Sequence, residues 1–305
     1  MWRDRVTPGV NSKRFCYRME RKRNTYRVAG LCFAVEGERL CKIIDSIDGF
    51  APFTTAGGDV LFSFAEGGEA PAMTQLRYEF EHEGVRGRFG RTEHGMLLTL
   101  DRVGEVLSIW HNVGEKVLLI NGKMESDLCR FAMWTGLGWM IAPHGAVAMH
   151  ASCIVYRGKA VLFLGASGTG KSTHTRLWLE NIEGASLLND DSPFLRAADG
   201  KVWAYGSPWS GKTPCYKQER YELAGCVRLS QAPYNEIRKL GVLQAYGAIH
   251  PSCPPAFAYD DALYEHICGL IDSLLSSVPC YHLACLPDRE AALLSFNTLF
   301  AGEAK

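Results

Sequence analysis

One segment, residues 159–180, constrains the fold of this chain more than any other. An apolar run at 159–164 leads into a glycine-rich stretch at 165–173, and a helix-compatible segment follows. The stretch matches the pattern Gly-x4-Gly-Lys-Ser, and a strand, a tight glycine turn and a helix in this order are typical of a phosphate-binding loop. The segment therefore predicts α/β architecture around it.

The chemistry of such a loop follows from its residue types. Glycines at 165, 168 and 170 let the backbone turn tightly and point its N–H groups inward, and the helix N-terminus adds positive potential there. We expect Lys171 to reach the phosphates and Ser172 to offer an oxygen to Mg²⁺. The candidate nucleotide-binding residues are Gly165, Ala166, Ser167, Gly168, Thr169, Gly170, Lys171, Ser172 and Thr173. The alternative, a glycine-rich turn before an ordinary helix, is disfavoured because the preceding strand, the lysine and the serine are all present.

Residues 206–213 match the same bare pattern. Pro208 stiffens the interior of this stretch, Pro214 follows it, and no amphipathic helix is evident. We therefore do not expect a second phosphate-binding loop. Two interpretations stay open: a tight surface turn, or a loop that brings Lys212 or Trp209 to the substrate side of the site.

An acidic pair, Asp190 and Asp191, follows the apolar residues 187–188. This order suits the end of a buried strand, and open α/β sheets bind their ligands at the carboxyl ends of strands. Two carboxylates there can divide the work, one holding Mg²⁺ and the other accepting a proton from an attacking hydroxyl. The alternative is a solvated turn, which the position about 20 residues after Lys171 disfavours.

A length of 305 residues suggests two domains, and the patterning changes near residue 124. We predict a β-rich domain over 1–124, with an antiparallel sheet, followed by a phosphate-loop α/β domain over 125–305. A tight turn at Asn121-Gly122 is expected to close the β-rich part. Its candidate strands are 26–35, 59–64, 75–81, 96–100 and 106–111.

Helical and strand patterns alternate after residue 124, as expected of an α/β layer. A buried helix is expected at about 125–141 and a strand at about 147–156. Asp260-Asp261 is a candidate cap for a helix with a stripe of leucine and isoleucine. A strand at 280–286 and a closing helix at 288–300 follow.

Charge and cysteine content limit the classes of partner. Lys and Arg number 33, as do Asp and Glu, so a basic coat for nucleic acid is not expected. The basic stretch 1–27 suggests a solvated leader, or else a docking tail for an acidic partner or RNA. The 11 cysteines contain no Cys-x-x-Cys pair, which predicts free thiols in a cytoplasmic protein.

A membrane span is not expected either. The stretch 131–156 carries no Asp, Glu, Lys or Arg, but Pro143, His144 and His150 interrupt it. The sequence does not decide the oligomeric state, and a homo-oligomer is one possibility.

Three short segments in order resemble the catalytic domain of bacterial HPr kinase/phosphorylase. They are Met149-His150-Ala151-Ser152, the loop from Gly165 to Ser172, and Asn189-Asp190-Asp191. The resemblance covers about residues 130–300 and implies a fold related to ATP-dependent phosphoenolpyruvate carboxykinase.

The resemblance implies a role for each matching residue. Lys171 binds phosphates, Ser172 and Asp190 serve Mg²⁺, Asp191 is the base, and His150 lies close to the reacting phosphate. The Glu-x-Arg-Gly-Leu-Gly stretch that the family links to phosphorolysis is not found after Asp191. We therefore expect neither HPr as the substrate nor phosphorolysis.

The sequence thus leads to one main hypothesis, an ATP-dependent, Mg²⁺-assisted kinase acting on a hydroxyl of a protein or small molecule. A nucleotide-sensing module without turnover is one alternative. A carboxykinase-like enzyme acting on oxaloacetate is the other, although its second metal set and its arginines cannot be placed.

Overall fold

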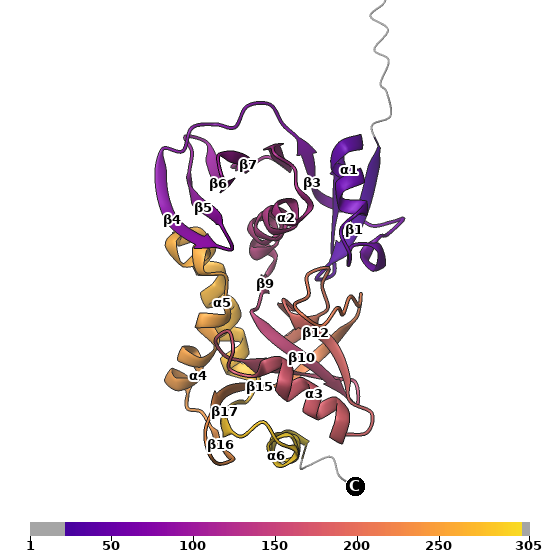
Figure 1. Cartoon of the computed structure of the whole chain (residues 1–305), viewed down its shortest axis with the longest axis vertical. Coiled ribbons are helices and arrows are strands. Elements are labelled where there is room, and N and C mark those ends of the chain that lie inside the picture. The colour runs from indigo at the N-terminus through magenta and orange to yellow at the C-terminus, as the bar shows by residue number, and fades with distance from the viewer. Residues whose placement is uncertain (1–21, 301–305) are drawn as a thin grey trace, which may run out of the picture.

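The computed structural model describes residues 22–300, so most of the predicted basic leader lies outside the described residues. Two large mixed β-sheets and their helices make up this part of the chain, which is α/β as predicted (Figure 1). We refer to the sheets as sheet A, from residues 23–122, and sheet B, from residues 146–285.

Sheet A has eight strands in the order β1-β2-β3-β8-β7-β6-β5-β4. They are β1 (Arg23–Val28), β2 (Leu31–Glu36), β3 (Val60–Glu66), β4 (Gln75–His82), β5 (Val85–Arg91), β6 (Gly95–Arg102), β7 (Glu105–Asn112) and β8 (Val117–Gly122). The expectation of a purely antiparallel sheet was wrong, because β2 pairs with β3 and β3 with β8 in parallel. Parallel neighbours need a crossover, and the unpredicted helix α1 (Glu38–Asp45) lies between β2 and β3.

Two turns in sheet A also differ from expectation. The single strand expected at 26–35 is a hairpin, because Ala29 and Gly30 both have positive φ, at 52° and 77°, as a two-residue hairpin turn requires. Asn121-Gly122 makes no tight hairpin. Both residues belong to β8 and pair with β7, and the chain continues into a helix.

Sheet B has nine strands, and β15 lies at its centre. The strands are β9 (Ala146–Ala148), β10 (Ala151–Tyr156), β11 (Lys159–Leu164), β12 (Ser186–Asp191), β13 (Phe194–Ala198), β14 (Lys201–Tyr205), β15 (Arg220–Gln231), β16 (Glu236–Lys239) and β17 (Cys280–Cys285). One side of β15 pairs with β11 in parallel. Its other side pairs first with β14 and then with β17. The strand before the glycine loop is therefore interior to the sheet, with β10 on its other side.

The strand expected at 147–156 is two strands, β9 and β10. The chain breaks at Met149-His150, where the two N–H groups donate to the carbonyls of Pro193 and Ser252 instead of a common neighbour. This break matters because it sets the position of His150.

Helix α2 (Ser126–Ile141), expected at about 125–141, lies inside the curve of sheet A (Figure 1). Gly136 permits this close packing, since a Cβ there would lie 2.7 Å from Cδ1 of Ile109 on β7. A single hydrophobic core contains buried residues of sheet A, of α2 and of sheet B, for example Phe64, Met133 and Phe194. Sheet A and sheet B therefore pack onto the same core.

The opposite face of sheet B carries α3 (Lys171–Asn181) and α6 (Arg289–Phe300), which pack on each other. Trp178 of α3 is fully buried, as expected of a core residue. Helix α5 (Asp261–Ser277) begins as predicted, with the Asp260 side chain accepting from the Leu263 N–H. The remaining helices are α4 (Val242–Ile249) and the short 3-10 turns η1 (Ala51–Phe53), η2 (Ala142–His144), η3 (His250–Ser252) and η4 (Pro255–Tyr259).

The described cysteines agree with the predicted thiols, since all ten between residues 22 and 300 are free. Within the same range, no helix has the length and apolar character needed to cross a membrane.

His174 gives the contact between α3 and α6 a pH dependence. Its Nε2 lies 3.0 Å from Oγ of Ser295, and burial lowers the pKa of His174 to about 4. Folding therefore favours the neutral ring. The contribution of neutral His174 to the free energy of unfolding is complete above the unfolded pKa of about 6.5 and is lost as the pH falls toward 4.

We predict that the free energy of unfolding falls by about 2 kcal/mol more in the wild type than in His174→Gln between pH 7 and pH 5. Urea denaturation at both pH values measures this difference. His94→Gln, a change of an exposed histidine, serves as the control and should follow the wild type. Equal pH dependence in wild type and His174→Gln would contradict the assignment.

Candidate active site

The glycine loop has the backbone that the sequence predicts. It connects the end of β11 to the start of α3, and Gly165, Gly168 and Gly170 have φ values of 154°, 80° and 102°. Residues other than glycine are strained at these positive φ values. Gly165 also lacks the space, because a Cβ there would lie 2.4 Å from Oγ1 of Thr169. Gln231 of β15 supports the loop by donating to the carbonyl of Gly168 at 3.1 Å.

The Lys171 ammonium folds back into this loop. Its Nζ donates to the carbonyls of Gly165 at 2.8 Å and Ala166 at 3.3 Å, and to Nε2 of His150 at 3.2 Å. Burial lowers the pKa of Lys171, while the charges of Asp191 and Asp190 raise it in opposition. The Lys171 ammonium is thus held at the N-terminus of α3, where backbone N–H groups also favour an anion.

His150 lies where β9 ends and β10 begins. Burial lowers the pKa of His150, and the charge of Lys171 lowers it further. An ammonium group only donates, so Nε2 of His150 accepts from Lys171 and the ring is neutral. The same Nε2 is 3.6 Å from Oδ1 of Asp191, which is beyond hydrogen-bond distance.

Asp190 and Asp191 point to opposite faces of sheet B, because successive side chains of a strand alternate between its two faces. Asp190 is 2% exposed and lies opposite Ser152 in the β10–β12 register. Its Oδ1 accepts hydrogen bonds from the hydroxyls of Ser152 and, at 3.0 Å, of Ser172. Its Oδ2 is buried and has no hydrogen-bond partner among residues 22–300.

These features fit a magnesium ion. A buried carboxylate oxygen without a partner is costly unless a ligand satisfies it, and the hydroxyl of Ser172 lies beside it. Mg²⁺ typically takes one or two protein oxygens together with phosphate oxygens and water. The described part of the chain has no cluster of three or more His, Cys, Asp or Glu side chains that could hold a metal alone. Ser172 and Asp190 therefore fit a metal that a nucleotide helps to hold.

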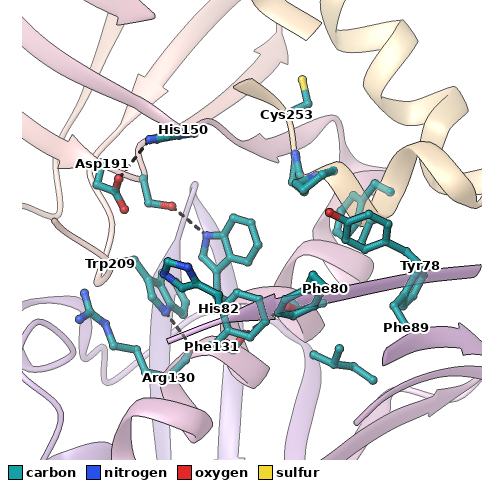
Figure 2. Close-up of a pocket in the computed structure, with 18 of the residues that line it drawn as sticks. Tyr78, Phe80, His82, Phe89, Arg130, Phe131, His150, Asp191, Trp209 and Cys253 are labelled. Atoms are coloured by element: carbon teal, nitrogen blue, oxygen red, sulfur yellow. Dashed lines mark hydrogen bonds and ion pairs between the residues drawn. The ribbon is translucent and has the colours of Figure 1, made fainter. Parts of the chain in front are cut away.

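Asp191 projects instead toward His150, and its side chain is about half exposed (Figure 2). Its φ is 123°, a region that L-residues rarely adopt and that is typical of strained functional positions. The loop 206–213 holds this conformation. Ser210 forms a β-bridge with Asp191, and the N–H of Gly211 donates to the carbonyl of Asp190.

The loop 206–213, the second match to the phosphate-loop pattern, thus lies against the acidic pair. Trp209 is 5% exposed, and its Nε1 donates to the carbonyl of Arg130 at 2.9 Å. It lines a cavity of about 650 Å³ that also borders His150 and Asp191. Of the two side chains considered from sequence, Trp209 lies at the cavity, whereas Lys212 is exposed and is not among its lining residues.

The structure brings together the residues to which the three segments gave a chemical role: His150, Lys171, Ser172, Asp190 and Asp191. Sequence reasoning named Ser152 within the segment 149–152 without giving it a role, and it missed Gln231 and Arg228. Ser152 holds Asp190, Gln231 holds the loop, and Arg228 lies close enough for its charge to lower the pKa of Lys171. Arg228 is opposite Leu164 in the β11–β15 register. No pattern in the sequence marks it, because β15 itself was not predicted.

Comparison with known proteins gives little beyond this geometry. No protein-family model matches the sequence. No curated protein matches it. Among solved structures, the HPr(Ser) kinase/phosphatase from Coxiella burnetii is similar to this chain at 13% identity and a TM-score of 0.30, over 51% of this chain and 95% of that one.

The backbone of Asp191 yields a stability prediction. We expect Asp191→Gly to be more stable than Asp191→Ala by about 1 kcal/mol, because glycine adopts a positive φ without steric strain and alanine does not. Chemical denaturation of both variants measures the difference. The same pair of substitutions at exposed Asp272 within α5 should give the opposite order, since glycine weakens a helix. A more stable Asp191→Ala would show that the φ of 123° is not strained.

Proposed function

We propose that this protein is an ATP-dependent kinase that transfers a phosphoryl group to a hydroxyl. The observation that carries the proposal is the position of Asp191. Its carboxylate is held by a strained backbone at a cavity, next to His150, which in turn contacts the phosphate-loop Lys171. A base beside a phosphate-binding cation is the arrangement that phosphoryl transfer to a hydroxyl needs.

Binding of the nucleotide falls to the glycine loop. Its N–H groups and the Lys171 ammonium contact the phosphates, and Arg228 adds a second cation near the same point. Ser172 and Asp190 would hold Mg²⁺, which when bound offsets the negative charge of the phosphates. The unpartnered Oδ2 of Asp190 supports this assignment.

Asp191 acts on the acceptor. Its carboxylate takes the proton of the acceptor hydroxyl as the hydroxyl oxygen forms a bond to the γ-phosphorus. The bond from that phosphorus to the β–γ bridging oxygen breaks, and ADP leaves. His150, neutral and in contact with Lys171, keeps the lysine side chain oriented beside the reacting group.

The geometry favours this reaction over the two alternatives. A module that only senses nucleotide needs no half-exposed carboxylate in a strained turn. A carboxykinase needs several cations for a dicarboxylate, and Arg130 is the only arginine among the described residues that line the cavity.

We predict that Lys171→Ala abolishes ATP binding, whereas Asp191→Asn binds ATP and loses phosphoryl transfer by about 10²–10⁴-fold. Calorimetry with ATP and Mg²⁺ measures binding. Incubation with γ-labelled ATP and lysate of the source cell measures transfer and reveals the acceptor. Asp272→Asn is the matched control and should change neither quantity. Transfer by Asp191→Asn at the wild-type rate would rule out Asp191 as the base.

A second prediction concerns the metal. Asp190→Asn retains the acceptor oxygen for both serine hydroxyls but removes the charge, so half-maximal ATP binding should need roughly tenfold more Mg²⁺. Titration of Mg²⁺ at fixed ATP measures this shift without any turnover. An unchanged Mg²⁺ requirement would remove Asp190 from the metal site.

A further inference from the structure

Four aromatic side chains, Tyr78, Phe80, Phe131 and Trp134, line the cavity beside Asp191. Tyr259 stacks on Tyr78 and extends this surface beyond the cavity lining, and we refer to the five residues as the aromatic wall. From Tyr259 to Trp134, consecutive rings lie with their centroids 5.0, 5.9, 5.6 and 5.9 Å apart, so the five side chains form one continuous surface. They come from three separate parts of the chain, η4, β4 and α2. Tertiary folding rather than local sequence therefore assembles the wall.

This wall is not simply part of the hydrophobic core. Phe131 is 38% exposed and Tyr259 is 52% exposed, and the neighbouring Leu76 is 45% exposed. A contiguous exposed apolar surface is uncommon in soluble proteins and is often a binding site. On the same strand, Glu79 forms an ion pair with Arg86 of β5, whereas Tyr78 and Phe80 line the cavity. The aromatic residues therefore form a distinct surface.

The wall ends at the reactive carboxylate. Nε1 of Trp134 donates to Oγ of Ser192 at 2.8 Å, and Ser192 is the residue after Asp191. Figure 2 shows Tyr78, Phe80 and Phe131 on one side of the cavity, and Asp191 and His150 at its far end. Trp209 lies near Phe131 in the same view and adds another ring to the lining. A molecule lying along the wall therefore reaches Asp191 with one end.

The cavity suits a small molecule. Its volume of about 650 Å³ falls within the roughly 300–1,000 Å³ typical of small-molecule pockets. Sheet A supplies β4 and β5 to its lining, so Asp191 lies in a hollow between sheet A and sheet B rather than on an open face.

Arg130, which lines the cavity, has one buried nitrogen without a hydrogen-bond partner among the described residues. Arg130 donates through Nη2 to the carbonyl of Ser210 at 3.0 Å, but its buried Nε has no partner among the described residues. The aromatic wall presents ring faces and edges to the cavity, and these offer few hydrogen-bonding groups. Glu81, His82 and Asp127 also line the cavity. Against the rings of the wall, however, a polyol or sugar would exchange its hydration for few hydrogen bonds, whereas a flat apolar body would stack.

We propose that the phosphoryl acceptor is a small molecule with a flat aromatic body and a terminal hydroxyl. The body stacks along the aromatic wall, and the hydroxyl lies at Asp191. This inference rests on the proposed kinase function and narrows its acceptor. In the transfer, the hydroxyl oxygen gains the phosphoryl group of ATP, Asp191 receives the proton, and ADP leaves.

The test uses 2-(indol-3-yl)ethanol as the probe, with glycerol and glucose as polar hydroxyl compounds of no aromatic character. Binding to the full chain without nucleotide is measured by saturation-transfer NMR and calorimetry. We expect binding of the indole alcohol only, weakened at least tenfold in Phe131→Ser and retained in Phe131→Tyr. Tyr234→Ser changes a tyrosine that is 55% exposed and does not line the cavity, so it should leave binding unchanged.

A second measurement separates this inference from the kinase proposal. Hydrolysis of γ-labelled ATP in water by the wild type tests the kinase proposal by itself. Transfer of label to the indole alcohol should fall in Phe131→Ser, whereas Tyr234→Ser should leave both the hydrolysis and the transfer at the wild-type rate. Failure of the indole alcohol to bind, or binding unaffected by Phe131→Ser, would overturn the aromatic acceptor alone. Label found in lysate proteins and absent from small molecules would overturn it too, and would support the kinase proposal.

Discussion

The candidate active site depends on how the chain is held at the end of β12. Asp190 and Asp191 are adjacent, yet one is buried against two serine hydroxyls and the other is half exposed beside His150. The alternation of a strand provides the separation, and the unusual φ of Asp191 directs its side chain to the cavity. The contacts of Ser210 and Gly211 maintain that backbone. These contacts therefore keep the Asp191 carboxylate at the cavity and apart from the buried carboxylate of Asp190.

Three charged or polar side chains then share one small region. Lys171 is held by loop carbonyls, and His150 lies between its ammonium and the carboxylate of Asp191. Burial lowers the pKa values of both Lys171 and His150. Lowered pKa values at a lysine and a histidine in one cleft are typical of functional sites rather than of surface ion pairs.

Much of the α/β part could be predicted, because its signals are local. The strand, glycine loop and helix at 159–180, the helix α2 and the Asp260 cap each depend on a short stretch of sequence. Sheet A was harder, since β5, β8 and α1 were not foreseen and the parallel pairing of β3 joins distant segments. The residues of the glycine loop and the acidic pair were given roles, whereas Ser152, Arg228 and the aromatic wall were not. Their roles arise only when separate strands become neighbours.

The shared core has a consequence for how this protein can change over evolutionary time. Sheet A contributes to the lining of the cavity and also packs onto the core that supports sheet B. A lineage could not exchange the front half of the gene without disturbing the packing of the half that carries the glycine loop. Diversification is therefore confined to side chains that face the hollow, with the framework behind them kept intact.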